Sequence, residues 1–366
     1  MTEKPLVLIA AGGTGGHLFP AEALATALQR LGVRVALASD TRVGKIATSF
    51  PAEEIVQIPA ATPSGRSPPQ MAKAALVLGF GVVRALAALR RLKPAVVVGF
   101  GGYPTVPPMT AASLLRIPSV LHEQNGVIGR ANRFLARRVS LIATGFRNVR
   151  GIPANVQAPI VHTGNPIRPA VLDAAQTPYA PLSRDGQLKL LVFGGSQGAR
   201  VMSEIVPAAI ERLSKDLLSN IAITQQAREE DLERVKASYA QLAVAADVQV
   251  FFTDLPRRIA EAHLVISRSG ASTVAELAAI GRPSILVPLP GALDQDQAAN
   301  AASLAEIGAA TVISQDLFTP ERLASEIESR FKEPHGLTRA AAAAKSAGVT
   351  DAADRLAAEV LRLATA

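Results

Sequence analysis

The sequence LVLIAAGGTGGH at residues 6–17 joins a short apolar run to a glycine-rich turn, and a helical pattern follows from Phe19 to Leu31. The sequence LKLLVFGGSQGA at residues 188–199 repeats this order, again before a helical pattern. A strand, a glycine turn and a helix start form a site where backbone N–H groups and the helix dipole attract an anion. Two copies, each opening one half of the chain, predict two α/β domains that hold a phosphate-bearing substrate in a cleft between them.

Strand-like runs alternate with helical patterns along the whole chain, which is typical of parallel α/β sheets. Six runs fall in each half, so we expect two six-stranded, doubly wound, Rossmann-like domains. We place them at residues 1–164 and 165–350, with a final helix within 351–366 that can pack on either domain. The expected strands are 6–10, 33–38, 55–58, 96–99, 119–122 and 141–143 in the first half, and 188–193, 221–224, 248–252, 264–267, 284–287 and 311–313 in the second.

Composition narrows the possible functions. The 366 residues suffice for two domains, and the absence of cysteine excludes disulfides, thiolate catalysis and thiolate metal sites. The net charge of +8 is uneven, because residues 1–165 carry 18 Lys/Arg against 6 Asp/Glu. Such a basic half predicts contact with an anionic surface. We expect no nucleic-acid partner, because the chain has no helix-turn-helix, zinc-finger or RNP-type motif and only 4% aromatic residues for stacking bases.

The N-terminal segment does not resemble a signal peptide, because Lys4 precedes only six apolar residues before the glycines. We therefore expect a cytosolic protein, or one attached to a membrane from its cytosolic side. The helix expected at residues 71–92 combines apolar residues with Arg and Lys, which fits either an interfacial helix on anionic lipid or an ordinary core-facing helix. On composition alone the core-facing interpretation is the stronger one.

Polar residues in the first half cluster where predicted strands end. His17 stands where the first glycine turn enters its helix, where an imidazole can act as general base or as a donor to phosphate. A third glycine turn precedes Tyr103, and the next strand ends in the polar run His122–Asn125. Within that run, Glu123 is the only acidic residue between residues 54 and 173. At the carboxyl edge of a parallel sheet, this concentration predicts a binding crevice.

The first glycine turn is neither a dinucleotide fingerprint nor a P-loop. Leu18 occupies the position of the third fingerprint glycine, and no Gly-Lys-Ser/Thr follows. Asp40 nevertheless lies where a ribose-binding acid stands in a dehydrogenase. A nicotinamide-dependent enzyme therefore remains an alternative.

In the second half, residues 267–276 join a predicted strand to a helix. Hydroxyl groups at the helix start, from Ser272 and Thr273, can bind phosphate oxygens, and Glu276 can accept both hydroxyls of a ribose. Further on, Asp294 and Asp296 have the spacing of a D-x-D metal site. Two acids in a first helical turn are also favoured by the helix dipole, and we prefer that interpretation.

Seven segments together resemble the MurG family, the bacterial transferases that add N-acetylglucosamine to undecaprenyl-diphospho-N-acetylmuramoyl-pentapeptide (lipid I). The resemblance covers essentially the whole chain and implies a GT-B architecture, two Rossmann-like domains with the sugar-nucleotide donor between them. The matching segments are Gly12–His17, Gly101–Tyr103, His122–Asn125, Gly164–Arg168, Gly194–Ala199, Arg268–Ala271 with Glu276, and Gln297 with Asn300.

The resemblance also implies roles for individual residues. His17 is implied as the catalytic base, with Glu123 as the second candidate. Two positions depart from the family pattern, because Phe252 replaces a smaller aliphatic residue and Asp296 replaces a glutamine or histidine. The implied substrate-binding residues are Thr14, Gly15, Gly16, Asn125, Arg168, Ser196, Phe252, Ala271, Ser272, Thr273, Glu276 and Gln297, and those on the acceptor side are Gly13, Tyr103 and His122.

The implied reaction is attack of the acceptor's C4 hydroxyl on the anomeric carbon of UDP-N-acetylglucosamine, with inversion and loss of UDP. It needs no cofactor and no metal. The implied partners are UDP-N-acetylglucosamine, an undecaprenyl-diphosphate-linked acceptor lipid and an anionic membrane surface, at the cytoplasmic face of the inner membrane. With this resemblance, the helix at 71–92 is expected to be membrane-proximal. The alternatives are another GT-B enzyme with a different acceptor, a UDP-sugar epimerase, or a non-catalytic nucleotide-binding regulator.

Overall fold

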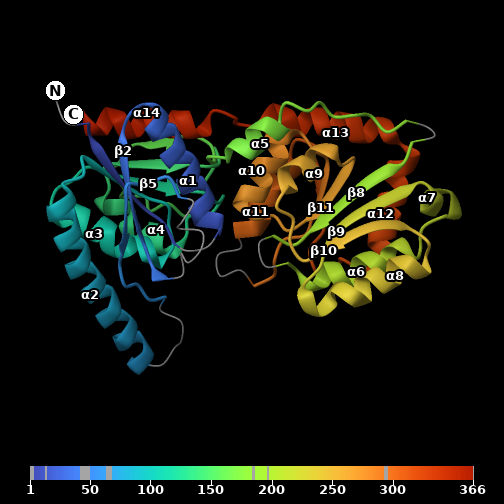
Figure 1. The fold of residues 1–366 in the computed structure, drawn as a ribbon, viewed down its shortest axis with the longest axis horizontal. Helices are drawn as coiled ribbons and strands as arrows, with labels where there is room; N and C mark the ends of the chain where they lie inside the picture. Colours follow the sequence, from blue (N-terminus) through green and yellow to red (C-terminus); the bar gives the residue numbers. More distant parts are fainter. Residues whose placement is uncertain are drawn as a thin grey trace. The chain divides into compact units, whose positions relative to one another are not determined.

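A computed structural model describes residues 4–12, 15–41, 50–62, 68–183, 186–195, 198–291 and 296–365. The chain forms two compact units, Met1–Arg168 with Thr350–Ala366, and Pro169–Val349. Each unit contains one sheet whose neighbouring strands all pair in parallel, with helices on its faces (Figure 1). The predicted fold class, two doubly wound α/β sheets, is confirmed.

The sheet of the first unit has the order β3-β2-β1-β4-β5-β6-β7. Its central strands are runs of Val, Leu, Ile and Ala buried on both faces, as expected for a parallel sheet covered by helices. The prediction of six strands was wrong by one, because a seventh strand pairs with β6 at the edge. The strands are β1 (Leu6–Ala10), β2 (Arg34–Ser39), β3 (Glu54–Gln57), β4 (Val96–Gly99), β5 (Ser119–Glu123), β6 (Leu141–Thr144) and β7 (Ile160–His162).

Helix α1 (Gly15–Arg30) starts four residues earlier than the sequence pattern indicated, so Gly15, Gly16 and His17 form its first turn. The last helix, α14 (Ala352–Ala364), packs on α1, and its buried Leu356 and Val360 belong to the same core cluster as β1. The other helical segments of this unit are α2 (Pro68–Leu92), η2 (Tyr103–Thr105), α3 (Val106–Leu114), α4 (Arg130–Leu135) and η3 (Ala136–Arg138).

The sheet of the second unit has the order β10-β9-β8-β11-β12-β13, with the six strands predicted. One strand was misplaced, because β10 ends at Gln249 and Phe252 lies beyond it. The strands are β8 (Leu188–Phe193), β9 (Ile221–Gln226), β10 (Ala245–Gln249), β11 (Leu264–Ser267), β12 (Ser284–Leu286) and β13 (Ala310–Val312). The helical segments are α5 (Pro169–Ala174), α6 (Arg200–Ile210), α7 (Lys215–Ser219), η4 (Glu229–Asp231), α8 (Leu232–Gln241), α9 (Leu255–Glu261), α10 (Ala271–Ile280), α11 (Asp296–Ala305), α12 (Pro320–Lys332) and α13 (Pro334–Ala347).

Both sheets reverse their strand order next to the strand that opens the unit. In the first unit β1 lies between β2 and β4, and in the second unit β8 lies between β9 and β11. Loops that leave the carboxyl ends of strands at such a point diverge and form a ligand crevice. The two glycine-rich turns of the sequence follow β1 and β8, so each lies at this point of its own sheet.

Candidate active site

His17 lies between two glycine turns of the first unit. A Cβ atom added at Gly102 would lie 3.3 Å from His17 Nε2, and one at Gly12 would lie 3.6 Å from His17 Cδ2. Gly102 also has a φ of 73°, a conformation that favours glycine. The turn after β4 therefore needs glycine at position 102 beside the imidazole, whereas a Cβ at position 12 would make an ordinary van der Waals contact with the ring. Gly13 and Thr14, two other predicted site residues, lie outside the described residues.

Glu123, at the end of β5, is buried and accepts four hydrogen bonds. Its Oε1 accepts the backbone N–H of Asn125 at 2.9 Å and the side-chain amide of Asn125 at 3.3 Å. Its Oε2 accepts the backbone N–H of Gly129 at 2.9 Å and Nδ2 of Asn132 at 2.8 Å. The carboxylate thus holds the loop between β5 and α4 in place.

The same contacts bear on whether Glu123 can act as a base. Burial raises the pKa of the Glu123 carboxyl, and the hydrogen bonds from Asn125, Gly129 and Asn132 oppose that rise. A carboxylate has about four lone-pair sites, and here all of them meet donors. A proton taken from a substrate would have to displace one of these donors. The geometry therefore favours His17 for proton transfer, and the assignment stays a prediction.

His122 lies inside the unit, with none of its surface exposed. Its Nε2 is 3.1 Å from the carbonyl oxygen of Gly164, and its Nδ1 is 3.3 Å from Nε2 of Gln124. Burial lowers the pKa of His122 to about 4, so the ring is neutral and donates from Nε2. Asn165 donates to the carbonyl of Gln124 at 2.9 Å. This buried network joins the end of β5 to segment 164–165, and the acceptor-side role of His122 is not tested by it.

Other predicted residues of the first unit lie close to α1 or to the Glu123 network. The guanidinium of Arg168 stacks over the ring of Phe19, 4.2 Å from its centroid, one turn into α1. Gly15 and Gly16 begin that helix. Asn125 is half-buried beside Glu123, as its two hydrogen bonds require. Arg168 is therefore brought together with α1 of the first unit, and its contact with the nucleotide stays a prediction.

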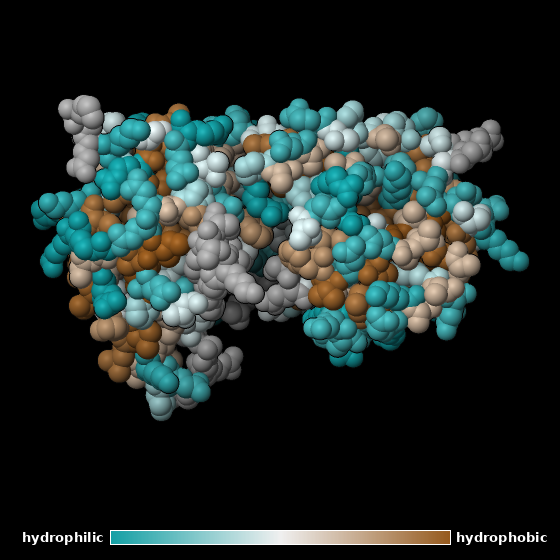
Figure 2. All heavy atoms as spheres, in the orientation of Figure 1, coloured by the Kyte–Doolittle hydropathy of each residue, from teal (hydrophilic) through white to brown (hydrophobic). Residues whose placement is uncertain are grey.

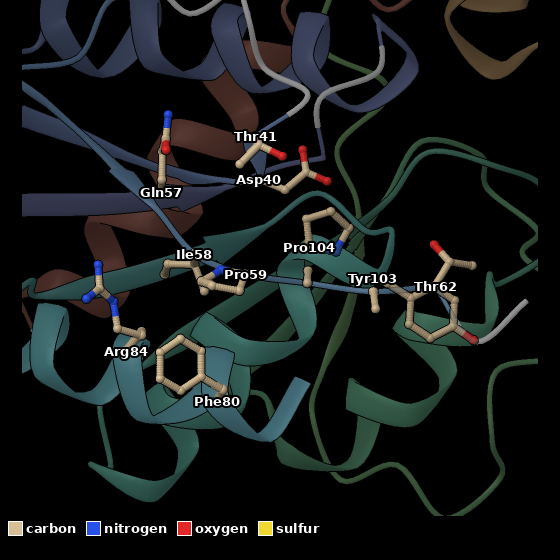
Figure 3. A pocket seen from close by; sticks show the side chains of 12 residues that line it. Asp40, Thr41, Gln57, Ile58, Pro59, Thr62, Phe80, Arg84, Tyr103 and Pro104 are labelled. Carbon is tan, nitrogen blue, oxygen red and sulfur yellow. The ribbon is translucent and has the colours of Figure 1, made fainter. Parts of the chain in front are cut away.

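Tyr103 lines a cavity of about 680 Å³ in the first unit (Figure 3). The cavity lies beyond the carboxyl ends of β2 and β3 and is bounded by α2 and η2. Asp40 also lines it, so this acid is near the predicted crevice. Figure 3 shows Phe80 and Arg84 projecting from α2 on one side and Asp40 on the other.

In the second unit, α10 begins at the turn after β11 with predicted residues in its first turn. Its N-cap, Gly270, has extended backbone and provides no side-chain cap, so first-turn N–H groups remain for another acceptor. Ala271, Ser272 and Thr273 are the first three residues of this helix, and Glu276 is buried in its second turn. The arrangement is suited to binding an anion, as the sequence indicated.

Hydrogen bonds connect this turn to α11. Ser269 Oγ donates to the carbonyl of Gln297 at 2.8 Å, and Asn300 Nδ2 donates to the carbonyl of Ser269 at 3.2 Å. The side-chain oxygen of Gln297 accepts the backbone N–H of Leu289 at 3.0 Å. Gln297 thus lies beside the α10 turn, as its predicted sugar contact requires. Ser196, the corresponding residue of the glycine turn after β8, lies outside the described residues.

Phe252 is buried, and the guanidinium of Arg258 covers its ring at 4.3 Å from the centroid. Arg258 is held by Asp254 at 2.7 Å and Asp247 at 2.6 Å. The ring is therefore occupied by protein contacts, and only the backbone of Phe252 remains for the predicted contact with uracil. The preceding residue, Phe251, is 59% exposed.

One of the two aspartates of the D-x-D pattern, Asp296, is explained by its position at the start of a helix. Asp296 is the first residue of α11, and its Oδ1 accepts the backbone N–H of Gln297 at 2.8 Å. Asp294 lies outside the described residues. Among the residues that are described, no group of three His, Asp or Glu side chains could hold a metal ion.

Two amide residues near the glycine turns were missed by sequence reasoning. Asn132 donates to Glu123 from nine positions later, and it lies against Gly101, where an added Cβ would approach its Nδ2 to 3.1 Å. Gln226 accepts the N–H of Gly194 at 3.0 Å and donates to the carbonyl of Val250 at 3.2 Å. The sequence offered one signal for Gln226, which is a polar residue at the end of a largely apolar strand. It offered no such signal for Asn132, which lies within helix α4.

Comparisons with known proteins agree with this architecture. Residues 7–144 match the glycosyltransferase family 28 N-terminal domain, and residues 189–356 match the C-terminal domain of that family. A curated relative from Methylorubrum extorquens is 64% identical over 99% of this chain and 98% of its own length. Its name is UDP-N-acetylglucosamine--N-acetylmuramyl-(pentapeptide) pyrophosphoryl-undecaprenol N-acetylglucosamine transferase.

Solved structures give the same result. The crystal structure of MurG from Acinetobacter baumannii is 31% identical, covers 98% of this chain and 99% of that chain, and has a TM-score of 0.79. The glycosyltransferase of kitacinnamycin is 18% identical with a TM-score of 0.68 over 98% of this chain and 100% of its own, and it shows the shared GT-B fold alone. The matches to both domains of the family agree with the 64% identity to a relative over nearly the whole chain, and they show that the chain belongs to glycosyltransferase family 28.

Proposed function

We propose that this protein transfers N-acetylglucosamine from UDP-N-acetylglucosamine to N-acetylmuramyl-(pentapeptide) pyrophosphoryl-undecaprenol. The observation that carries the proposal is 64% identity, over nearly the whole of both chains, to a transferase named for that reaction. The reaction needs one group to accept the proton of the acceptor hydroxyl and another to stabilise the leaving diphosphate. The turn after β1 offers a candidate for the first in one unit, and the start of α10 after β11 offers candidates for the second in the other.

His17 is the proposed general base. The C4 hydroxyl of the muramyl sugar attacks the anomeric carbon of the donor, its proton passes to the imidazole, and the bond to UDP breaks with inversion. Support comes from the position of His17 in the first turn of α1, between Gly12 and Gly102, and from the saturated hydrogen bonding of Glu123. A base positioned in this way contributes about 10²–10⁴ in rate.

The leaving UDP is proposed to lie on the second unit. First-turn N–H groups of α10, with Ser272 and Thr273, would stabilise the developing charge on the diphosphate. Glu276 would accept the ribose hydroxyls, and Gln297 would contact the sugar. Because backbone N–H groups and hydroxyls do this work, the mechanism assigns no role to a metal.

We also propose that the protein is peripheral at the cytoplasmic face of the membrane and contacts it through α2. Leu76 and Val83 are 75% and 62% exposed, and Figure 2 shows apolar side chains gathered where α2 lies. Pro69–Leu92 has the length and composition of a membrane span, but Ala85 and Leu89 are buried on the face that packs against α3. A helix with one face in a domain core and the other apolar and exposed is suited to lying on a membrane surface.

The test of the reaction is transfer of labelled N-acetylglucosamine to the lipid-linked acceptor with EDTA present. Labelled disaccharide-lipid is the expected product. His17→Gln should lower kcat about 10²–10⁴-fold while UDP binding is retained. His335→Gln, which alters an exposed histidine of α13, is the matched control and should leave kcat unchanged. Normal turnover of His17→Gln would remove this residue from the role, and no product with demonstrated UDP binding would contradict the acceptor.

A further inference from the structure

The cavity lined by Tyr103 is not used by the mechanism above, although it lies next to the proposed base. Its volume of about 680 Å³ falls in the range of about 300–1,000 Å³ that is typical of ligand pockets. Residues that follow β2 and β3 form one side, and α2 forms another. Tyr103 and Pro104 of η2 complete the lining (Figure 3).

The cavity shares this η2 wall with His17. Tyr103 and Pro104 directly follow Gly102, the glycine whose added Cβ would lie 3.3 Å from His17 Nε2 and 3.5 Å from Pro104 Cδ. An added Cβ at Gly12 would lie 3.4 Å from Pro104 Cγ. A sugar whose reacting hydroxyl meets the imidazole therefore has this cavity beside it.

The chemistry of the acceptor decides which of its substituents reaches that space. In N-acetylmuramic acid the peptide is attached through the lactyl ether on C3, the carbon next to the reacting C4. The diphosphate is attached to C1, on the other side of the ring. When the C4 hydroxyl points at His17, the substituents nearest to it are the lactyl ether on C3 and the hydroxymethyl group on C5, and of these only the lactyl ether carries a chain long enough to extend into the cavity.

The side chains of the lining suit a peptide better than they suit the other parts of the acceptor. Gln57, Thr62 and Tyr103 can donate and accept hydrogen bonds, as the amide groups of an extended peptide require. Arg84 can pair with a carboxylate, and it forms no ion pair within the described part of the chain, whereas Arg91 on the same helix is bonded to Glu54.

The diphosphate and the isoprenoid chain of the acceptor fit this cavity less well than the peptide does. The diphosphate is attached to C1, across the sugar ring from C4, so it starts away from this cavity when the C4 hydroxyl points at His17. An isoprenoid chain would have to cover Gln57 and Arg84, and burying such polar groups without hydrogen bonds is unfavourable.

We propose that the cavity bounded by β2, β3, α2 and η2 binds the pentapeptide of the acceptor, with Arg84 paired to a peptide carboxylate and Gln57 and Tyr103 bonded to its amides. The proposal rests on the proposed function, and it names the part of the acceptor that this region recognises. It makes the peptide a contributor to acceptor affinity, although the peptide takes no part in the chemistry.

The kinetic test compares two water-soluble, short-chain acceptors, one with the pentapeptide and one with the muramyl sugar and diphosphate alone. Arg84→Gln should raise KM about tenfold for the pentapeptide acceptor, as expected for loss of one charge-assisted hydrogen bond. It should leave KM for the peptide-free acceptor and for UDP-N-acetylglucosamine unchanged. Arg90→Gln, an exposed arginine of α2 outside the cavity, is the matched control and should change neither. An equal rise for both acceptors, or no change, would overturn the assignment.

A binding measurement separates failure of this site from failure of the proposed reaction. N-Acetylmuramyl-pentapeptide without lipid is titrated into the full-length protein by calorimetry, and Arg84→Gln should weaken its binding about tenfold while Arg90→Gln does not. If the wild type forms no product but binds this ligand through Arg84, the reaction is wrong and the site stands. If the wild type uses both acceptors with equal kcat/KM and binds no muramyl-pentapeptide, the site is wrong and the reaction stands.

Discussion

Replacing Glu123 by glutamine separates a structural carboxylate from a catalytic one. The carboxylate accepts two hydrogen bonds on each oxygen, from Asn125 on one and from Gly129 and Asn132 on the other. Glutamine has the same size but one oxygen, so its NH₂ group must face one of the two donor pairs. If it faces Gly129 and Asn132, rotation of the Asn132 amide can offer an oxygen, and the N–H of Gly129 is left without an acceptor.

The loss of stability in Glu123→Gln can be estimated from these hydrogen bonds. One buried backbone donor without a partner costs about 1–3 kcal/mol. The remaining bonds lose their ionic character, which lowers stability, but the variant no longer carries the cost of burying a charge, the same cost that raises the pKa of the Glu123 carboxyl. Because these two changes oppose each other, we expect Glu123→Gln to lower the free energy of unfolding by about the 1–3 kcal/mol of the unpaired donor.

Urea unfolding measures this loss, and turnover of the folded variant measures any catalytic role. Glu54→Gln is the matched control, because Glu54 forms an exposed ion pair with Arg91, and its loss should leave the free energy of unfolding close to that of the wild type. Turnover of Glu123→Gln well below its unfolding midpoint should stay within about tenfold of wild type, far from the 10²–10⁴ lost with a general base. Wild-type stability together with a hundredfold fall in kcat would refute the reasoning and make Glu123 the base.

Three further predictions concern other parts of the chain. His122 has a folded pKa of about 4 against 6.5 for the free group, so it contributes stability above pH 6.5 that is lost as the pH falls toward 4. The difference in unfolding free energy between wild type and His122→Gln should shrink by up to about 3 kcal/mol over that range, and a constant difference would contradict the buried neutral ring. Leu76→Asp should reduce co-sedimentation with anionic vesicles several-fold, whereas Leu31→Asp, at another exposed leucine of the first unit, should not; equal effects would remove α2 as the membrane contact. Arg282→Met should lower the unfolding free energy by about 3–5 kcal/mol, measured in urea, because five backbone carbonyls lose a buried donor; a neutral result would mean that they find other partners.

The sequence was sufficient for the architecture because its signals are local and repeated. Buried parallel strands such as β1 and β8 are continuous apolar runs, and the glycine turns that follow them mark the reversal of strand order. Strand β7 was missed because Ile160–His162 is only three residues long and lies at the sheet edge, where periodicity is uninformative. The boundaries of β10 were displaced because two phenylalanines after the strand continue its apolar pattern.

The site was harder to predict because a run of polar residues in the sequence does not indicate how deeply each side chain is buried. His122 and Glu123 were expected at a crevice surface because polar side chains follow a strand there. The environment of His122 depends instead on the Gly164 carbonyl, 42 residues away, and that of Glu123 on the path of the loop up to Asn132, nine residues away. Contacts of this kind decide how deeply a side chain is buried, and the local sequence pattern does not indicate them.

Because helix α14 belongs to the first unit, that unit is completed only after the second unit has been synthesised. The first unit is made of residues from both ends of the chain, and Leu356, Ala357 and Val360 fill the same core as β1 and α1. During synthesis the ribosome releases the whole second unit before these side chains emerge. The half of the molecule that is translated first is therefore the last to be completed, and until then the apolar surface that α14 covers remains uncovered.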